Sequence, residues 1–285
     1  MRRNSNMTHK ARYSIGDVSK ICNISKKALR YYDSIGLITS DRHEGNNYRY
    51  YDKSALLLVP VIKYYKQMGF TLEEMSQFIE GDTPNVYQAL KKSFTAKINE
   101  LETERLALGR KRQSAEDWYE LIVEAQLVIE TSITSVSVKY VEPRPYLYLD
   151  QTFDNDIKSA IINIDWTNFL EKVGNEITGP VILNFTSTKS RIEQKAQPFR
   201  ILQKTLIPHE IEPQKVLGGC MMASCYHIGD HGNIAETYKK MIAWAKDSGY
   251  VLADESFERC VTDYWTTSNS AQFVTEVLIK ITKHS

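Results

Sequence analysis

A long stretch without a strong helix breaker lies in the middle of the chain and limits what the chain can form. Asp82-Thr83-Pro84 supplies a cap and an N1 proline, and from there to Thr131 only Gly109 weakens a helix. A helix of about 45 residues spans roughly 68 Å, which is too long to pack along one small domain. The 285 residues are enough for two domains. The sequence therefore predicts two folded parts joined by a helix over 82–131.

One face of this helix carries a heptad-like seam. Its positions follow spacings of four and three residues, and eight of the eleven are apolar. They are Phe94, Ile98, Leu101, Arg105, Leu108, Arg112, Ala115, Tyr119, Ile122, Gln126 and Ile129. Such a seam can pair with a second copy of the helix or pack back on its own chain.

The charge is distributed unevenly along the chain. Residues 1–70 hold 13 Lys/Arg against 5 Asp/Glu, whereas the whole chain has a net charge of only +1. Eight of the 17 tyrosines also fall in these 70 residues. Lysine, arginine and tyrosine side chains all serve as phosphate contacts, so this composition favours a nucleic acid as the partner over a membrane surface.

The basic part carries the helix start and stop signals of a helix-turn-helix. Ser14 and Asp17 form a capping-box pattern, Asn23 breaks the first helix, and Ser25 caps a second helix that Gly36 ends. The exposed arc of the second helix is predicted to be basic and aromatic: Lys26, Lys27, Arg30, Tyr31 and Tyr32. Its apolar side, comprising Ala28, Leu29 and Ile35, is expected to face the core. The second helix of such a motif normally enters the major groove.

A hairpin and two further helices are predicted next. Residues 41–47 are rich in turn formers, and Tyr48-Arg49-Tyr50-Tyr51 reads as the return strand of a wing. Asp52 caps a helix that ends near Gly69, and Thr71-Leu72-Glu73-Glu74 is a capping box for another helix, which Gly81 closes. Tyr51 is compatible with simple core packing.

These motifs, taken in order, resemble the MerR family of transcription regulators. They are Tyr13-Ser14-Ile15-Gly16-Asp17-Val18, Ala28-Leu29-Arg30-Tyr31-Tyr32-Asp33, Gly36-Leu37, Tyr48-Arg49-Tyr50-Tyr51 and Gly69-Phe70-Thr71-Leu72-Glu73-Glu74. The resemblance implies a winged helix-turn-helix over 13–81, after a tail at 1–12. It also implies DNA contacts, which with the basic arc give the predicted set Tyr13, Lys26, Lys27, Arg30, Tyr31, Tyr32, Arg49, Tyr50 and Lys66.

The family resemblance also bears on partners. It implies that the long helix pairs with a second copy in an antiparallel homodimer. Such a dimer would read palindromic double-stranded promoter DNA and remodel an over-long spacer for RNA polymerase. In metal-sensing relatives cysteines near the end of this helix bind the ion, but residues 82–131 contain neither Cys nor His. We therefore expect no metal and no cofactor.

From Ser132 onward the pattern changes to strands mixed with helices. Strands are predicted over 135–141, 146–152, 181–187, 202–207, 216–227, 256–265 and 273–282, with helices near 166–173 and 233–248. The order loosely repeats, which suggests a duplicated α+β domain over 132–285 whose two sheet units face each other. The fold class is thus multidomain, α followed by α+β.

This part resembles the GyrI-like effector-binding domain, and the whole chain resembles the multidrug-binding branch of the MerR family. The resemblance implies a pocket for a lipophilic, cationic small molecule, with Glu258 as the acid and Trp166, Tyr226 and Phe273 as the surrounding rings. A carboxylate flanked by rings can bind a cation by charge pairing and by cation–π contacts. The alternative for Glu258 is an ion pair with Arg259, although strand alternation puts Arg259 on the opposite face. The alternative for Trp166 and Phe273 is core packing.

Two other functions remain open from the sequence. A GyrI-like hydrolase fused to a DNA-binding domain would use Glu258 as a base, although no Ser-His-Asp constellation supports a conventional hydrolase. A purely architectural DNA binder would have an empty pocket. The longest apolar run, 56–62, is too short to span a membrane, and residues 1–14 lack a signal-peptide pattern, so we expect a cytoplasmic protein. Cys22, Cys220, Cys225 and Cys260 are expected to be buried, reduced thiols.

Overall fold

The computed structural model describes residues 12–42, 48–79, 85–208 and 214–283, and these form two compact units. One unit ends at Leu106 and the other begins at Ala107, so the division falls within a long helix. The expected tail at 1–12 lies almost wholly outside the described residues, as do the wing tip and the predicted boundary at 80–84. In the described part, no helix is long and apolar enough to cross a membrane.

The N-terminal unit is a small winged helical bundle. Its helices are α1 (Ile15–Ile21), α2 (Lys26–Ser34), α3 (Lys53–Gln67) and α4 (Leu72–Ile79). Its three short strands, β1 (Tyr13–Ser14), β2 (Asp41–Arg42) and β3 (Arg49–Tyr51), form an antiparallel sheet in the order β1-β3-β2. Leu29, Tyr51, Val59 and Ile62 are among the residues of its buried core. Tyr51 therefore packs in the core.

Side-chain caps fix the helix starts of this unit as predicted. The Ser14 hydroxyl accepts from Asp17 N while Asp17 accepts from Ser14 N, which is the expected capping box. Ser25 accepts from Ala28 N at the start of α2, and Asn23 takes a left-handed conformation in the turn before it. Thr71 and Glu74 cap α4 in the same reciprocal way.

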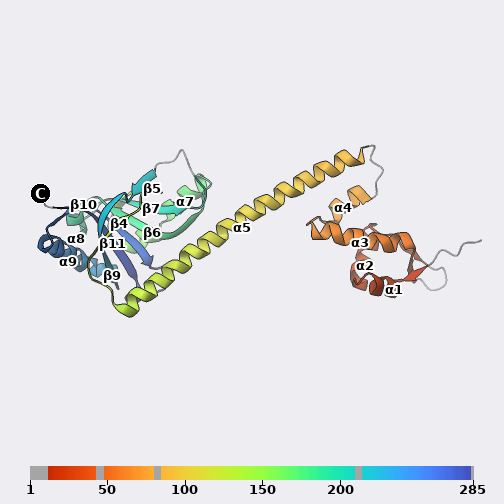
Figure 1. Cartoon of the computed structure of the whole chain (residues 1–285), viewed down its shortest axis with the longest axis horizontal. Helices are drawn as coiled ribbons and strands as arrows, with labels where there is room; N and C mark the ends of the chain where they lie inside the picture. The colour runs from red at the N-terminus through yellow and green to blue at the C-terminus, as the bar shows by residue number, and fades with distance from the viewer. Residues whose placement is uncertain (1–11, 43–47, 80–84, 209–213, 284–285) are drawn as a thin grey trace, which may run out of the picture. The chain divides into compact units, whose positions relative to one another are not determined.

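The central helix α5 runs without interruption from Val86 to Thr131 (Figure 1). Phe94 packs into the N-terminal core. Farther along, Leu121, Ala125 and Val128 are buried against Val261 and Val274 of the C-terminal unit. Much of the predicted seam is left exposed on the same helix, comprising Ile98, Leu101, Leu108, Tyr119, Ile122 and Ile129. In the described residues, most of the seam therefore does not pack back on its own chain.

The C-terminal unit is built on one eight-stranded antiparallel sheet in the order β4-β9-β11-β10-β6-β7-β5-β8. The strands are β4 (Ser137–Val141), β5 (Arg144–Phe153), β6 (Ile177–Phe185), β7 (Gln197–Thr205), β8 (Gln214–Leu217), β9 (Cys220–Ile228), β10 (Tyr250–Thr262) and β11 (Val274–Lys283). The helices are α6 (Ile157–Ile161), α7 (Ile164–Lys172), α8 (Thr188–Ile192) and α9 (Ile234–Asp247). Two groups of four strands meet where β6 pairs with β10. The prediction of two sheet units facing each other is therefore wrong: the halves join edge to edge.

The sheet has two different faces. The face that we call the α9 face is covered by α7 and α9, whose Trp166 and Tyr238 lie in its buried clusters. The opposite face, which we call the α5 face, packs its Val261 and Val274 against the C-terminal half of α5. Because side chains alternate along a strand, Glu258 and Cys260 of β10 project to the α9 face, whereas Arg259 and Val261 project to the α5 face.

The cysteines differ in burial. Cys225 and Cys260 are buried, as expected, but Cys22 and Cys220 are only partly buried, and all four are free thiols. Cys22 lies at the end of α1 and Cys220 opens β9, where each is near the surface of its unit.

A glycine pair divides the predicted strand 216–227 into β8 and β9. Gly218 and Gly219 both have positive φ, at 101° and 74°. A Cβ atom on Gly218 would lie 2.3 Å from the Glu142 carbonyl oxygen, whereas one on Gly219 would lie 3.5 Å from Pro143. Residue 218 must therefore be glycine for two reasons, backbone conformation and lack of space.

We predict that Gly218→Ala lowers the free energy of unfolding by about 3 kcal/mol, because the residue would be both strained and in collision with backbone. Gly219→Ala is the matched control and should cost only about 1 kcal/mol, for the left-handed conformation alone. Urea denaturation of the two variants measures the difference. Equal losses would contradict the steric argument.

Candidate DNA-binding surface and ligand cleft

Most of the predicted DNA contacts lie on the surface of the N-terminal unit. Lys26, Lys27, Arg30 and Lys66 are exposed, and Tyr31 is half-exposed. Tyr13, Arg49 and Tyr50 are partly buried in the small sheet. The described residues thus bring basic side chains from α2 together with the base of the wing within one unit.

Tyr32 does not lie on the exposed arc. It is only 4% exposed and packs in the core with Leu29, three residues earlier on the same side of α2. Ile35, which was expected to face the core, is 37% exposed, and Leu37 and Ile38 take its place inside. The predicted position of Tyr32 is therefore wrong. Tyr32 follows Leu29 by three residues and so shares its buried side of α2, whereas Ile35 is the C-cap residue beyond the helix end at Ser34.

The wing is attached to the recognition helix by an ion pair. Arg49 Nε donates to Asp33 Oδ2 at 2.6 Å, and Ser40 donates to Asp33 Oδ1 from both its amide and its hydroxyl. Burial alone would raise the pKa of Asp33, but the hydrogen bonds from Arg49 and Ser40 outweigh it and lower that pKa. Arg49 therefore has a structural partner, which fixes the strand of the wing relative to α2.

The four predicted pocket residues are not brought together. Trp166 is buried under α7 with its indole N–H donating to Gln203 Oε1 at 2.6 Å. Phe273 is fully buried against Tyr264 and His231. Both therefore pack in the core, which was the alternative for them. Only Tyr226 projects to the α5 face, where its hydroxyl donates to Glu124 Oε1 at 2.8 Å.

Glu258 lies on the predicted strand but is enclosed on the α9 face. It is 0% exposed. Arg191 Nε donates to Glu258 Oε1 at 2.7 Å and Arg191 Nη2 to Oε2 at 3.2 Å, while the Tyr238 hydroxyl donates to Oε1 at 2.9 Å. The Arg191 guanidinium also stacks over the rings of Phe153 and Phe185. Glu258 is therefore a carboxylate close to aromatic rings, as expected, but the cation that it binds is Arg191 of the chain itself.

The alternative partner, Arg259, does project to the opposite face, as strand alternation predicted. There it lies beside a cleft of about 440 Å³ between the end of α5 and the sheet. The cleft is lined by charged groups, tyrosines and aliphatic side chains: Glu124, Lys139, Tyr140, Val141, Glu142, Arg144, Tyr146, Ile182, Leu217, Tyr226, Arg259, Glu276 and Leu278. Its size falls in the range of small-molecule sites.

A row of polar residues crosses the floor of this cleft. Tyr226, Glu276 and Arg259 are direct cross-strand neighbours on β9, β11 and β10. Arg259 donates to Glu276 Oε2 at 3.1 Å and, through its two Nη atoms, to both oxygens of Glu124 on α5 at 2.6 and 2.7 Å. The second oxygen of Glu276 accepts from Ser224 and Lys139. Of the three glutamates that line the cleft, Glu124 and Glu276 are therefore each bound to an internal cation.

Burial and ion pairing shift the pKa values of Glu124, Arg259 and Tyr226. Burial would raise the pKa of Glu124, but Arg259 outweighs it and lowers that pKa. Burial lowers the pKa of Arg259, yet its hydrogen bonds to Glu124 and the two acidic charges raise it overall. Burial, together with Glu276 and Glu124, raises the pKa of Tyr226. Glu124 and Arg259 are therefore charged, and Tyr226 is neutral, near pH 7.

The sequence reasoning missed Glu124, Glu276 and Arg259 as cleft residues. The alternation that put Arg259 opposite Glu258 was a signal for Arg259 alone, because the face of Glu276 depends on the register of β11 against β10. Glu124 had no such signal, since the seam of α5 was assigned to a different side of the helix.

Comparison with known proteins finds a family model for the C-terminal part of the chain and another for the N-terminal part. The model of the GyrI-like small molecule binding domain matches residues 134–282, more than half of the chain, and the MerR HTH family regulatory protein model matches residues 13–82. The chain is a MerR-family DNA-binding regulator with a GyrI-like ligand-binding domain.

Relatives of this regulator include two proteins of Bacillus subtilis. The multidrug-efflux transporter 2 regulator is 23% identical over 281 residues, covering 94% of this chain and 96% of that protein. The multidrug-efflux transporter 1 regulator is 48% identical over 66 residues, 23% of this chain and 24% of that protein. Among solved structures, EcmrR in complex with DNA matches over 95% of this chain and 100% of that chain, with a TM-score of 0.45 and 19% identity.

The buried ion pair of Glu258 and Arg191 allows a direct test of whether Glu258 lies in the interior. We predict that Glu258→Gln lowers the free energy of unfolding by about 3 kcal/mol, because it leaves the Arg191 guanidinium buried without a counter-charge. The exposed pair of Asp150 and Arg200 is the control, and Asp150→Asn should cost less than about 1 kcal/mol. Urea denaturation measures both. A Glu258→Gln variant as stable as the wild type would contradict the assignment of Glu258 to the interior.

Proposed function

We propose that this regulator acts as a homodimer that binds a palindromic promoter site and activates transcription when a lipophilic cation occupies the cleft on the α5 face. The observation that carries the proposal is the Glu124–Arg259–Glu276 row. It joins a ligand-sized cleft to the long helix that continues into the DNA-binding unit.

DNA binding is assigned to α2, the wing and the turn after α3. Lys26, Lys27 and Arg30 are exposed on α2, the second helix of the motif, which normally enters the major groove. Tyr13, Tyr31, Tyr50 and Lys66 complete the proposed contacts, and Arg49 serves from its position beside Asp33. Tyr32 is left out because it is buried.

Dimerisation is assigned to the exposed seam of α5. Ile98, Leu108 and Tyr119 are each more than 60% exposed, and isolated helices do not leave such a row of large apolar groups in water without cost. An antiparallel pair of α5 helices covers the row and gives the twofold symmetry that a palindromic site requires. RNA polymerase would then use the promoter whose spacer the dimer distorts.

The effector is assigned to the cleft by charge and shape. Lys139, which is 43% exposed in its side chain, neutralises Glu276, which is only 2% exposed. An incoming cation with an apolar body can replace this partly exposed ammonium, while Ile182, Leu217 and Leu278 receive its apolar surface. Tyr226 and Tyr146 offer ring faces to the charge. The names of the Bacillus subtilis relatives are compatible with a drug-like effector.

Turnover of the effector is not part of the proposal. Glu258, the candidate base of a hydrolase, has both oxygens bound by Arg191 and lies on the face away from the cleft. Within the cleft, Glu124 and Glu276 are held by Arg259. We therefore propose a sensor without enzymatic activity.

The DNA-binding assignment predicts the behaviour of Arg30→Ala. This variant should lose at least tenfold in affinity for an operator selected from randomised duplexes, and the slope of log affinity against log salt should fall by about 1, since one phosphate or base contact is removed. Fluorescence anisotropy at several salt concentrations measures both. Lys172→Ala on α7 removes an exposed cation from the other unit and should change neither value. Equal binding of random duplex and selected operator by the wild type would contradict the assignment.

The cleft assignment predicts a preference for one sign of charge. Tetraphenylphosphonium and tetraphenylborate have nearly the same shape and opposite charges. The wild type should bind the cation saturably, as followed by calorimetry, and the anion at least tenfold more weakly, a difference of about 1.4 kcal/mol or more.

Two variants sharpen this prediction. Glu276→Gln should weaken binding of the cation at least tenfold, and Lys139→Met should strengthen it several-fold, because it removes the ammonium that competes for Glu276. Both variants should melt within a few degrees of the wild type. Equal affinity for the two ions, or a Lys139→Met variant that binds the cation no better than the wild type, would contradict a cation site at Glu276.

A further inference from the structure

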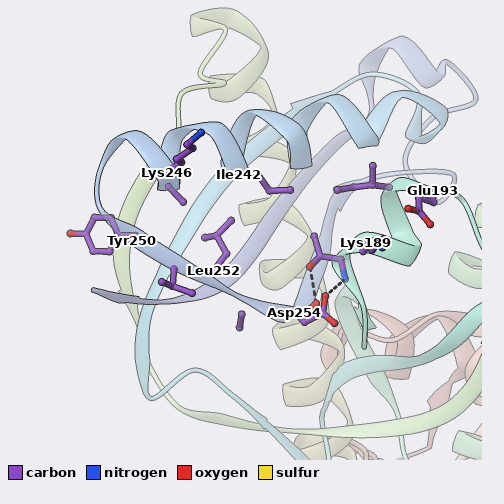
Figure 2. Close-up of a pocket in the computed structure, with 12 residues that line it drawn as sticks. Lys189, Glu193, Ile242, Lys246, Tyr250, Leu252 and Asp254 are labelled. Carbon is purple, nitrogen blue, oxygen red and sulfur yellow. Dashed lines mark hydrogen bonds between the residues drawn. The ribbon is translucent and has the colours of Figure 1, made fainter. Parts of the chain in front are cut away.

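The groove on the α9 face carries charges of both signs. It has a volume of about 520 Å³ and lies between α8, α9 and the start of β10 (Figure 2). Lys189 and Lys246 line it together with Glu193 and Asp254, and Figure 2 shows Ile242 between the two lysines. These groups select no class of ligand, whereas a carboxylate in the N-terminal unit points to a definite role.

The wing of the N-terminal unit is joined to the recognition helix α2 through this carboxylate, which belongs to Asp33. Ser40, which precedes β2, donates to Asp33 Oδ1 from its amide at 3.1 Å and from its hydroxyl at 2.8 Å. Arg49, the first residue of β3, donates from Nε to Asp33 Oδ2 at 2.6 Å. Each oxygen of Asp33 therefore holds a different strand of the wing.

The two strands of the wing are otherwise held unequally. β3 pairs with both β1 and β2, and its Tyr51 is buried in the core. β2 lies at the edge of the three-stranded sheet and pairs with β3 through Asp41 and Arg42. Asp33 therefore adds a direct attachment of α2 both to the start of the edge strand and to the first residue of β3.

The position of Asp33 on α2 is unfavourable for a direct contact with a polyanion. It follows Lys26 by seven residues and Arg30 by three, which places it on the same side of the helix. A carboxylate there repels DNA phosphates unless a cation balances its charge. Arg49 supplies this cation, and the side chain of Asp33 is only 13% exposed. The carboxylate is therefore better suited to holding the wing than to contacting DNA.

We propose that Asp33 is a positioning residue for sequence-specific DNA binding, which acts through Arg49 and Ser40. It fixes the angle between the wing and α2, so that contacts of the wing with the DNA backbone set the register of Lys26 and Arg30 in the major groove. Backbone contacts position a protein on a duplex, whereas contacts with base edges specify the sequence. The proposal rests on DNA binding by the N-terminal unit and is independent of the cleft and its effector.

Fluorescence anisotropy with the full chain tests the proposal by comparing a selected operator with a random duplex. If only charge matters, removing an acid from a basic surface strengthens the attraction to both duplexes. If Asp33 positions the wing, Asp33→Asn should instead weaken operator binding at least tenfold, while the affinity for random duplex stays equal or rises. The ratio of the two affinities therefore separates positioning from charge.

Three further variants separate positioning from other effects. Ser40→Ala removes the hydroxyl bond to Asp33 and should lower the operator-to-random ratio several-fold. Asp41→Asn is the matched control, because it removes an exposed acid from β2, and it should not lower the ratio. In an Arg49→Met background, Asp33→Asn should lower operator affinity by less than a further threefold, because the main partner of Asp33 is already absent.

The proposal is overturned if Asp33→Asn keeps the wild-type ratio, if Asp41→Asn lowers the ratio as much, or if Asp33→Asn still costs tenfold in the Arg49→Met background. An equal loss of affinity for both duplexes also overturns it, because that result indicates a role in stability alone. A wild type that binds both duplexes equally would contradict the DNA-binding assignment as a whole, and this proposal with it.

Discussion

The ion pair between Glu124 and Arg259 joins the long helix to the sheet of the ligand-binding unit. Both side chains are less than a third exposed, and the arginine binds both oxygens of the carboxylate, a geometry that gives strong and directional pairing. Arg259 also holds Glu276, which in turn is held by Lys139 and Ser224. One arginine thus connects a helix, the middle of the sheet and the cleft between them.

This connection gives the proposed effector a route to the DNA-binding unit through α5. A cation that competes for Glu276 changes the charge around Arg259, and Arg259 is the partner of Glu124 on α5. In this proposal a shift at Glu124 acts on α5, the helix of 46 residues whose Phe94 packs in the N-terminal core. The apolar contacts of Leu121, Ala125 and Val128 keep this end of the helix on the sheet while the polar contacts change.

Local signals in the sequence predicted the local structure well. The capping residues Ser14, Ser25 and Thr71 marked helix starts that the structure confirms, because a cap depends only on residues a few positions away. The order of motifs was also sufficient to predict the MerR and GyrI-like resemblance. The family models confirm it.

The errors concern properties that depend on residues far apart in the sequence. The rotation of α2 that buries Tyr32, the joining of the two half-sheets through β6 and β10, and the arginine that covers Glu258 are all set by tertiary packing. Arg191 is 67 residues from Glu258, and no local pattern links them. Glu258 therefore lies on a strand that borders the cleft, but its side chain projects to the opposite face from Arg259, the next residue.

In vitro transcription with the Glu124→Gln variant tests the central claim most directly. The template is a promoter that carries the selected operator, and tetraphenylphosphonium is added or withheld. The account predicts that the variant binds the operator like the wild type but loses most of the ligand-dependent increase in transcript, because α5 no longer shares a charge with Arg259. A variant that responds to the ligand as fully as the wild type would contradict a signal carried through Glu124.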